Sequence, residues 1–370
     1  MGPTEITTDE LASRSDDFVI LDVREDHEVR TGRIPGSCHL PVARIAEVGE
    51  LIPDPDRPVA VYCSVGIRSA SAADAMRAMG YSDVRNLRGG FGRWVGEGLP
   101  SERQARLTDA QAERYARHLV LPQVGPDGQE RLMGATVAIV GAGGLGSPVA
   151  MYLAAAGVGT LGIIDFDVVD ASNLQRQVIH PTDRVGEPKT SSAAATVRAL
   201  NPEVVAIEHP VRLEAANVLE VLDGYQVIVD ATDSFPTRYL INDASLHLGT
   251  PVVHGSIFRF DGQVTVFDPW NGPCYRCLFV APPPPEAAPN CAEAGVLGVL
   301  PGVIGSLQAT EVLKSLLGIG DPLTGRLLMY DALAASTDEV RFRRDPSCPA
   351  CSDPDRLPTL IDYDESCAPA

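Results

Sequence analysis

The feature that most constrains the fold is a stretch of 30 residues, 135–164, that contains no charged side chain. By length alone it could cross a bilayer as a helix. Seven glycines and one proline interrupt it, however, and Asp165 follows it directly. Within it, the segment TVAIVGAGGLGS has the pattern of a buried strand, a glycine-rich turn and the start of a helix. We therefore predict a strand, turn, helix and second strand of a soluble domain, and no membrane segment.

Strand-like and helix-like segments continue to alternate after this stretch. The strand-like segments are TVAIV, TLGIID, VVAIEH and YQVIVDAT, with alanine-rich helical stretches between the first three. Such alternation predicts an α/β fold with a mostly parallel sheet and helices on both faces. The later segment GQVTVFDP indicates an antiparallel addition to that sheet.

The first hundred residues form a second α/β pattern, so the chain of 370 residues is expected to hold two domains. FVILDV and PVAVYC are strand-like, and RSASAADAMRAMG is helix-like. We place the first domain at 1–100, a polar linker at 101–108, the second domain at 109–352 and an acidic tail at 353–370. A capping-box pattern, TDAQ, predicts that the second domain begins with a helix carrying ERYARHLVL.

The charge balance limits the partners of the chain. It carries 30 basic and 49 acidic residues, a formal charge of −19, which repels phosphate backbones and leads us to expect no nucleic-acid binding. The first residues, MGPTEITTDELASRSDDF, are polar and lack the basic and apolar regions of a signal peptide. We therefore expect a cytoplasmic protein with a small or basic partner.

Cys63 is the first candidate for chemistry. It ends a predicted strand and is followed by a short loop and a helix, where backbone N–H groups and the helix dipole stabilise a thiolate. Protein phosphatases place five residues between such a cysteine and an arginine, and rhodanese-type sulfurtransferases place four. Four residues separate Cys63 from Arg68, which favours a loop that holds a persulfide sulfur as an anion.

The sequence around Cys63 resembles the rhodanese family over the first hundred residues. The matching segments are LDVRE, GRIPGSCHLP, the Cys63 loop and NLRGGFGRW. The resemblance implies a sulfurtransferase whose Cys63 accepts sulfane sulfur from thiosulfate or a cysteine desulfurase. A non-enzymatic rhodanese-like module is the alternative. Cys38, in the PGSCHLP turn, is interpreted as a bystander.

The glycine-rich loop, with Gly141, Gly143, Gly144 and Gly146, predicts a phosphate-binding turn at a helix N-terminus. Asp165 closes the next strand, where a carboxylate can accept a hydrogen bond from a ribose hydroxyl. These features alone also fit an NAD-linked oxidoreductase. Downstream, Asn173, Arg176 and Lys189 suit a triphosphate, and Asp233, just beyond a strand end, suits Mg²⁺.

From about residue 108 to 351 the chain resembles the ubiquitin-activating-like adenylyltransferases of the MoeB, ThiF and MoeZ kind. These enzymes use ATP to activate the C-terminal glycine of small ubiquitin-fold sulfur carrier proteins. The resemblance implies contacts to ATP or its Mg²⁺ from Gly143, Asp165, Asn173, Arg176, Gln177, Lys189 and Asp233. It also implies that Arg117 reaches the nucleotide site of a neighbouring subunit, and hence a homodimer.

Eight cysteines in a chain of this length, without a secretion signal, favour metal binding or catalysis over disulfides. Two Cys-x-x-Cys pairs match a closed four-thiolate Zn²⁺ site, and the resembling family carries a structural zinc in this way; the four cysteines are Cys274, Cys277, Cys348 and Cys351. Cys291 lies in a proline-rich loop, where the family often has a cysteine able to form an acyl thioester or acyl disulfide; an exposed thiol without an obligatory role is the alternative. Cys367 has no assigned role.

Together these features predict an enzyme that adenylylates a sulfur carrier and then transfers sulfur to it. A persulfide on Cys63 attacks the acyl-adenylate, and Cys291 or an external thiol releases the carrier thiocarboxylate. Three alternatives remain open from the sequence: a conjugating enzyme acting through a Cys291 thioester, an NAD-linked oxidoreductase, and a carrier-docking scaffold without activity.

Overall fold

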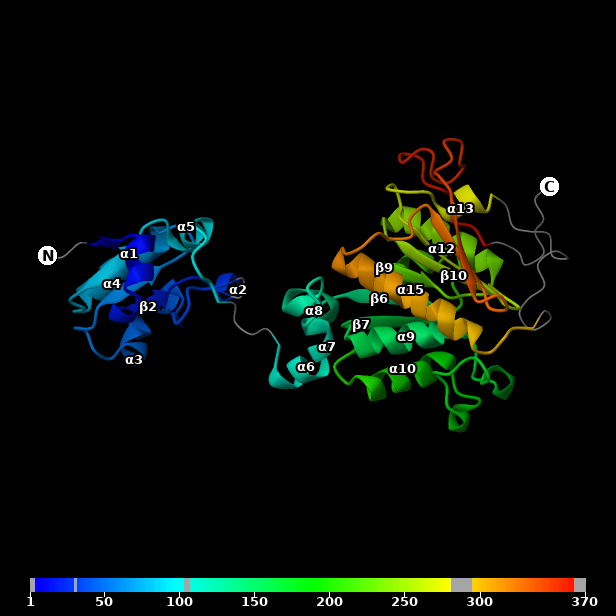
Figure 1. Cartoon of the computed structure of the whole chain (residues 1–370), viewed down its shortest axis with the longest axis horizontal. Coiled ribbons are helices and arrows are strands. Elements are labelled where there is room, and N and C mark those ends of the chain that lie inside the picture. Colours follow the sequence, from blue (N-terminus) through cyan, green and yellow to red (C-terminus); the bar gives the residue numbers. More distant parts are fainter. Residues whose placement is uncertain (1–3, 30–31, 103–106, 281–294, 363–370) are drawn as a thin grey trace. The chain divides into compact units, whose positions relative to one another are not determined.

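The computed structural model describes residues 4–29, 32–102, 107–280 and 295–362. The chain divides into two compact units, Met1–Ala110 and Gln111–Ala370 (Figure 1). Each unit contains a sheet of its own with helices packed against it.

The first unit is built on a five-stranded, fully parallel sheet in the order β1-β5-β4-β2-β3. Its strands are β1 (Glu5–Ile6), β2 (Val19–Asp22), β3 (Cys38–His39), β4 (Val59–Tyr62) and β5 (Val84–Leu87). Its α-helices are α1 (Thr8–Ser13), α2 (Asp26–Val29), α3 (Val48–Leu51), α4 (Ile67–Ala78) and α5 (Gly90–Gly96), and 3₁₀ turns cover Ser15–Asp17 and Val42–Glu47.

The central strand β4 is buried on both faces. Val59 and Val61 pack into one apolar cluster with residues of α3 and α4, whereas Ala60 and Tyr62 pack into a second cluster with residues of α1 and α5. Successive side chains of a strand point to opposite faces, so a strand covered by helices on both sides is apolar throughout. This burial fixes the position of Cys63, the next residue of the chain.

The second unit contains an eight-stranded sheet in the order β13-β12-β11-β10-β9-β6-β7-β8. The strands from β10 to β8 in this order pair in parallel, and β11, β12 and β13 extend the sheet antiparallel beyond β10. The strands are β6 (Thr136–Val140), β7 (Thr160–Ile164), β8 (Val205–His209), β9 (Val227–Asp230), β10 (Val252–Phe258), β11 (Asp261–Phe267), β12 (Arg326–Asp331) and β13 (Ser336–Arg341).

Helices cover both faces of this sheet. Residues of α9, α10 and α15 form one apolar core with the strands, and residues of α11 and α12 form another on the opposite face (Figure 1). The helices are α6 (Asp109–Arg114), α7 (Ala116–Leu119), α8 (Gly125–Met133), α9 (Gly146–Ala156), α10 (Lys189–Leu200), α11 (Val218–Leu222), α12 (Phe235–Leu248), α13 (Tyr275–Leu278) and α15 (Leu300–Leu317), with 3₁₀ turns at Ala171–Asn173 and Thr182–Arg184.

The α/β class predicted from the sequence is confirmed, and the charge-free stretch forms β6, the glycine turn, α9 and β7. In the described part of the chain no helix is long and apolar enough to cross a membrane. One local prediction is wrong: the helix expected after residue 108 breaks at Tyr115 into α6 and α7. The Tyr115 ring is buried against Gly157, and its hydroxyl accepts a hydrogen bond from Asn201 (2.9 Å), so tertiary contacts override the local helical pattern.

Candidate functional site

Cys63 lies at the carboxyl end of β4, in the loop that leads into α4, and is 1% exposed. The backbone N–H of Gly66 donates to its Sγ (3.1 Å), and the Ser69 hydroxyl lies 3.3 Å from the same atom. Burial raises the pKa of the Cys63 thiol, but hydrogen bonds from Ser69 and the loop outweigh it and lower the pKa overall. The loop therefore favours the thiolate, the nucleophilic form.

A second glycine-rich segment, which contains Gly90, packs closely against the Cys63 loop. A Cβ at Gly90 would lie 2.2 Å from the carbonyl oxygen of Cys63, and Gly90 has a φ of +59°. The following residue, Phe91, donates its N–H to that same carbonyl (2.8 Å). Only glycine allows this close approach of the two backbones, which is a physical reason for the NLRGGFGRW segment.

Arg68 lies on the first turn of α4, where its guanidinium interacts electrostatically with the Cys63 sulfur and makes its stronger hydrogen bonds to other residues. Its guanidinium binds both carboxylate oxygens of Glu28 (2.6 and 2.7 Å) and the Ser64 hydroxyl (3.1 Å). The Arg68 guanidinium also holds the pKa of Glu28 well below its ordinary value. That Arg68 holds a persulfide sulfur stays a prediction, and sequence reasoning missed Glu28, which is 40 positions away.

The glycine-rich loop of the second unit follows β6, as predicted. Gly141 has a φ of +99°, and a Cβ on Gly146 would lie 1.9 Å from the Gly141 carbonyl oxygen. Gly143 faces the side chain of Gln177, and Gly144 faces Pro301 at the start of α15. Gly141 and Gly146 are therefore required by the turn itself. Gly143 and Gly144 have no side chain, so the loop backbone lies close to the surface of the site.

Asp165 lies at the end of β7, next to this loop. One carboxylate oxygen accepts the N–H of Ala142 and the other accepts the N–H of Asp167, both at 2.8 Å. Burial raises the pKa of Asp165, while the charge of Lys189 acts in the opposite direction. The carboxylate is thus fixed against the glycine loop.

The predicted polar groups gather around the same edge of the sheet. Arg176 donates to Asn173 (2.7 Å), and Lys189, which is 6% exposed, forms an ion pair with Asp167 (3.0 Å). Gln177 is buried, and its Oε1 lacks a hydrogen-bond partner. A buried polar atom left unpaired is costly, so this amide is suited to a ligand that completes the site.

Asp233 also belongs to this edge. It follows β9, which pairs in parallel with β6, and a Cβ on Gly141 would touch Ala231 and Thr232 just before it. The side chain of Asp233 is exposed. Parallel strands end at one edge of a sheet, so a carboxylate here lies beside a ligand on the glycine loop.

Arg117 is the one predicted nucleotide contact that lies elsewhere in the described chain. It is exposed on α7, two residues after Tyr115, which packs on Gly157 at the C-terminal end of α9. The glycine loop is at the N-terminal end of that helix, which is 11 residues, or roughly 16 Å, long. Arg117 therefore lies near the opposite edge of its own sheet.

The four cysteines of the two Cys-x-x-Cys pairs converge, with all four sulfur atoms within 4.8 Å of one another. The separations are 3.9 Å for Cys274–Cys277, 3.6 Å for Cys274–Cys348 and 3.4 Å for Cys277–Cys351. Four sulfurs bound tetrahedrally at about 2.3 Å from one ion would lie about 3.8 Å apart. The cluster therefore has the spacing of a metal site, and it ties the C-terminal segment to α13.

The thiols of this cluster have divergent pKa values. Burial raises the pKa of Cys277 to about 11, whereas interaction with the Cys274 thiol lowers the pKa of Cys351 to about 5. Four thiolates this close repel one another, so their joint ionisation requires a bound cation.

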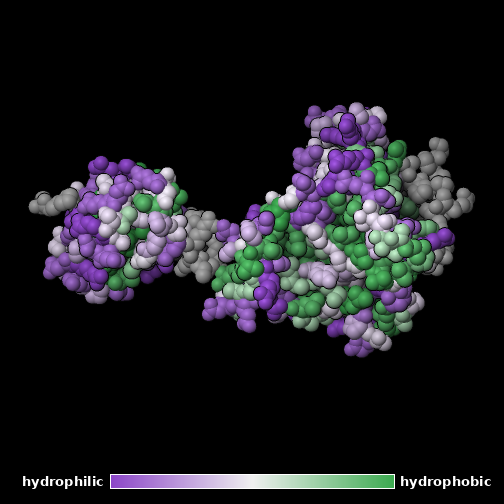
Figure 2. Space-filling model, viewed as in Figure 1, coloured by the Kyte–Doolittle hydropathy of each residue, from purple (hydrophilic) through white to green (hydrophobic). Residues whose placement is uncertain are grey.

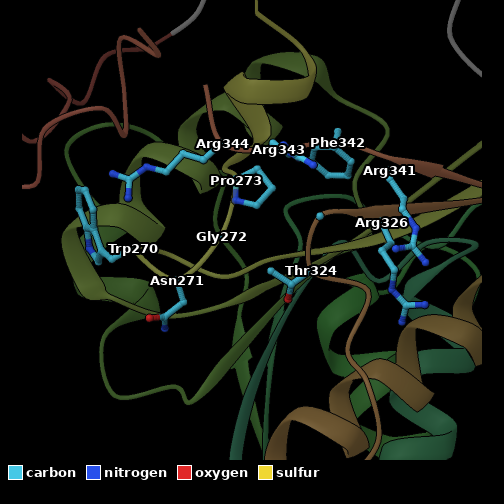
Figure 3. Close-up of a pocket in the computed structure, with 11 residues that line it drawn as sticks. Trp270, Asn271, Gly272, Pro273, Thr324, Arg326, Arg341, Phe342, Arg343 and Arg344 are labelled. Atoms are coloured by element: carbon cyan, nitrogen blue, oxygen red, sulfur yellow. The ribbon is translucent and has the colours of Figure 1, made fainter. Parts of the chain in front are cut away.

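A pocket of about 570 Å³ lies beside the cysteine cluster and was not predicted from the sequence (Figure 3). Figure 3 shows Arg344 extending toward Trp270, while Arg326 and Arg341 lie at the opposite end. Both Arg326 and Arg341 pair with Glu339. None of the predicted site residues lines this pocket.

Three cysteines lie outside the Cys63 loop and the metal-binding cluster: Cys38, Cys291 and Cys367. Cys38 is half-buried in β3 and packs against the core of the first unit, consistent with a bystander. Cys291 and Cys367 lie outside the described residues.

The folds and sites define two classes, an α/β nucleotide-binding unit with a cysteine cluster and a unit with a cysteine in an anion-binding loop. Residues 115–350 match the model of the ThiF family and residues 7–97 match the rhodanese-like domain. The chain belongs to the ThiF family and carries a rhodanese-like domain before it, as the sequence predicted.

Named relatives agree with this assignment. The chain is 56% identical to the "Sulfur carrier protein adenylyltransferase" of Thermus thermophilus over 71% of this chain and 98% of the relative. It is 47% identical to the "Probable adenylyltransferase/sulfurtransferase MoeZ" of Mycobacterium tuberculosis over 72% of this chain and 67% of the relative. These relatives confirm the predicted enzyme class, an adenylyltransferase with a sulfurtransferase domain, and do not support an NAD-linked oxidoreductase.

Solved structures share the fold. The crystal structure of E. coli MccB with ATP superimposes with a TM-score of 0.59 and 20% identity, over 70% of this chain and 80% of that chain.

Proposed function

We propose that the second unit uses Mg·ATP to adenylylate the C-terminal glycine of a small ubiquitin-fold sulfur carrier protein, and that Cys63 then supplies the sulfur. The observation that carries the first half is the set of groups around the glycine loop. Asp165, Arg176 and Lys189 lie with that loop at one edge of the sheet. Such groups bind ribose and offset phosphate charge as pyrophosphate leaves.

The proposed role of each nucleotide residue follows from its place. The glycine loop backbone approaches the phosphates, Asp165 accepts from the ribose, and Asp233 holds Mg²⁺. Arg176 and Lys189 must release Asn173 and Asp167 in part to contact phosphate. The Gln177 amide, with its unpaired Oε1, completes the binding surface.

The second half of the proposal rests on the lowered pKa of Cys63 and the hydrogen bonds around its sulfur. The Cys63 thiolate accepts a sulfane sulfur from thiosulfate or a cysteine desulfurase. Its persulfide then attacks the acyl-adenylate and displaces AMP, giving an acyl disulfide. A second thiol, that of Cys291 or an external one, attacks this disulfide, is oxidised with Cys63 to a new disulfide, and releases the carrier thiocarboxylate.

The deciding experiment mixes the full chain with ATP, Mg²⁺, thiosulfate and a candidate carrier, and weighs the carrier by mass spectrometry. We expect the mass gain of one sulfur replacing one oxygen. Cys63→Ala should abolish that gain but keep carrier-dependent ATP–pyrophosphate exchange, and Cys38→Ala is the matched control. Full thiocarboxylate formation by Cys63→Ala would overturn the persulfide role.

The conjugating-enzyme alternative differs in one product. If Cys291 carries the carrier as a thioester, Cys63→Ala retains full activity and a thiol-sensitive carrier adduct forms on the chain. That adduct, absent from Cys291→Ala, would favour conjugation over sulfur transfer.

We propose that the ion of the cysteine cluster is Zn²⁺, because four sulfur donors leave no open position for chemistry. Its role is then structural. Cys348→Ser should release the metal, measured by elemental analysis, and lower the free energy of unfolding of the second unit by several kcal/mol. The control variant Cys38→Ser should neither release the metal nor lower the free energy of unfolding of the second unit.

We also propose a homodimer in which Arg117 serves the nucleotide site of the second subunit. Exposed apolar side chains lie near it, with Val120 73% and Leu121 47% exposed, and Tyr152 on α9 is 59% exposed. Figure 2 shows hydrophobic residues gathered on this face of the second unit, around α8, α9 and α15. Sedimentation should give twice the chain mass, and Arg117→Ala mixed with Arg176→Ala should regain pyrophosphate exchange; a monomer with full activity would contradict this.

A further inference from the structure

We propose that Glu28 is a specificity-determining residue of the Cys63 site: it holds Arg68 in a closed ion pair and thereby disfavours sulfur donors that carry two negative charges. The inference deepens the proposed function and rests on Cys63 being the sulfur acceptor. Two classes of sulfur donor are possible, an inorganic oxyanion such as thiosulfate and a persulfide on a protein cysteine. We expect the chain to prefer the second class.

The ion pair is bidentate and spans the loop. Glu28, on α2, binds both terminal nitrogens of Arg68, and one of its oxygens also accepts from the Ser64 hydroxyl (2.5 Å). Both ends of the segment that follows Cys63 are thus tied to one carboxylate. Two parallel charge-assisted hydrogen bonds make such a pair geometrically stable, so the Arg68 charge is already compensated before a donor arrives.

In the described part of the chain, the cation that interacts with the Cys63 sulfur is Arg68, whose charge is shared with Glu28, and the other donors to the sulfur are neutral. Ser69 and the loop N–H groups contact Cys63, and they can stabilise one negative charge, that of a thiolate or persulfide. The side chains that project from the loop are apolar, since Val65 is 64% and Ile67 is 74% exposed. A loop whose arginine charge is already compensated by Glu28, with an apolar rim, suits a protein surface that presents a persulfide better than it suits a small, strongly hydrated dianion.

The transfer step is the same for every donor. The Cys63 thiolate attacks the terminal sulfur of the donor, the donor S–S bond breaks, and the leaving group keeps the electron pair. That leaving group is sulfite from thiosulfate, methanesulfinate from methanethiosulfonate, and a thiolate from a protein persulfide. Cyanide then takes the sulfur from Cys63 as thiocyanate and restores the thiolate, which allows turnover to be measured without a carrier.

The test compares two small donors that differ by one charge, the thiosulfate dianion and the methanethiosulfonate monoanion. The readout is the ratio of kcat/KM for thiosulfate to kcat/KM for methanethiosulfonate, with the full chain at low ionic strength. Glu28→Gln frees the Arg68 charge and should raise this ratio about five- to tenfold. Glu25→Gln, which removes an equal charge from an exposed side chain three residues away, should leave the ratio within about twofold.

A purely structural role for Glu28 would change the rates with both donors alike and leave the ratio unchanged, which would overturn the inference. An equal rise in Glu25→Gln would overturn it too. If Glu28→Gln loses transfer from both donors, Arg68→Ala decides, because it removes the cation beside the Glu28 carboxylate and should lower the ratio at least about threefold. An unchanged ratio would then count against the proposal.

Failure of the inference and failure of the proposed function have different signatures. If Cys63→Ala transfers sulfur to cyanide as fast as the unaltered chain, the role of Cys63 itself is wrong. If transfer requires Cys63 but Glu28→Gln does not change the ratio of the two kcat/KM values, only the proposed role of Glu28 in donor selectivity is wrong.

Discussion

The two units use the same local arrangement of strand, loop and helix for different chemistry. In each, a central parallel strand ends in a glycine-containing loop that leads into a helix: β4 into α4 in the first unit and β6 into α9 in the second. Each loop presents backbone N–H groups at a helix N-terminus, which favours negative charge.

The two loops differ in which partners form hydrogen bonds with the polar groups around them. Around Cys63 the donors already point at the protein's own sulfur. Around the second loop, Arg176 and Lys189 are bound to Asn173 and Asp167, and the Gln177 Oε1 is unpaired. A site for a covalent intermediate is thus complete within the chain, whereas a site for a diffusible nucleotide must exchange internal contacts for those of its ligand.

The largest expected effect separates the two sites. Arg176→Ala should lower ATP–pyrophosphate exchange about 10²- to 10³-fold, because it removes a cation from the leaving phosphates. Sulfur transfer to cyanide by Cys63 should stay unchanged in the same variant. The control is Arg184→Ala, a nearby half-buried arginine paired with Glu187.

The comparison of the two sites would be wrong if Arg176→Ala slowed both ATP–pyrophosphate exchange and sulfur transfer to cyanide. Such a result would mean that the first unit depends on an occupied nucleotide site, and that the two sites are not independent.

A second comparison concerns the glycines beneath the loops. Gly146→Ala would bring a Cβ within 1.9 Å of the Gly141 carbonyl, and Gly90→Ala would bring one within 2.2 Å of the Cys63 carbonyl. Each should destabilise its own unit by about 2–4 kcal/mol and leave the other unit's activity intact. Thermal unfolding with a separate activity assay for each unit would measure this; Gly302→Ala, which meets open space, is the control.

The sequence predicted the strand, turn and helix units because these depend on local patterns. It also predicted that Asp165 and Asp233 follow strand ends, and parallel strands that end together bring such residues to one edge of the sheet. The break at Tyr115 was missed, since its cause is a contact with Gly157. The Glu28–Arg68 pair was missed for the same reason, as two distant segments meet only in the folded unit. The Ser69 contact had a signal, a hydroxyl on the first turn after Arg68.

The smallest expected effect tests how the first site is kept ready. Ser69→Ala removes a hydroxyl that lies 3.3 Å from the Cys63 sulfur and stabilises its thiolate. Because such hydrogen bonds lower the pKa of Cys63, the loss of the Ser69 hydroxyl should raise that pKa. The pH profile of Cys63 alkylation should then shift to higher pH, with the reactive fraction falling severalfold at a pH below the pKa and converging with that of the unaltered chain at high pH.

Ser71→Ala, an exposed serine on the same helix, should leave the profile in place. If Ser69→Ala slows alkylation by the same factor at every pH, the hydroxyl shapes access to the sulfur rather than its ionisation. The thiolate would then depend on the loop N–H groups alone, and the two sites would resemble each other more closely than proposed, each relying on backbone N–H groups to bind its anion.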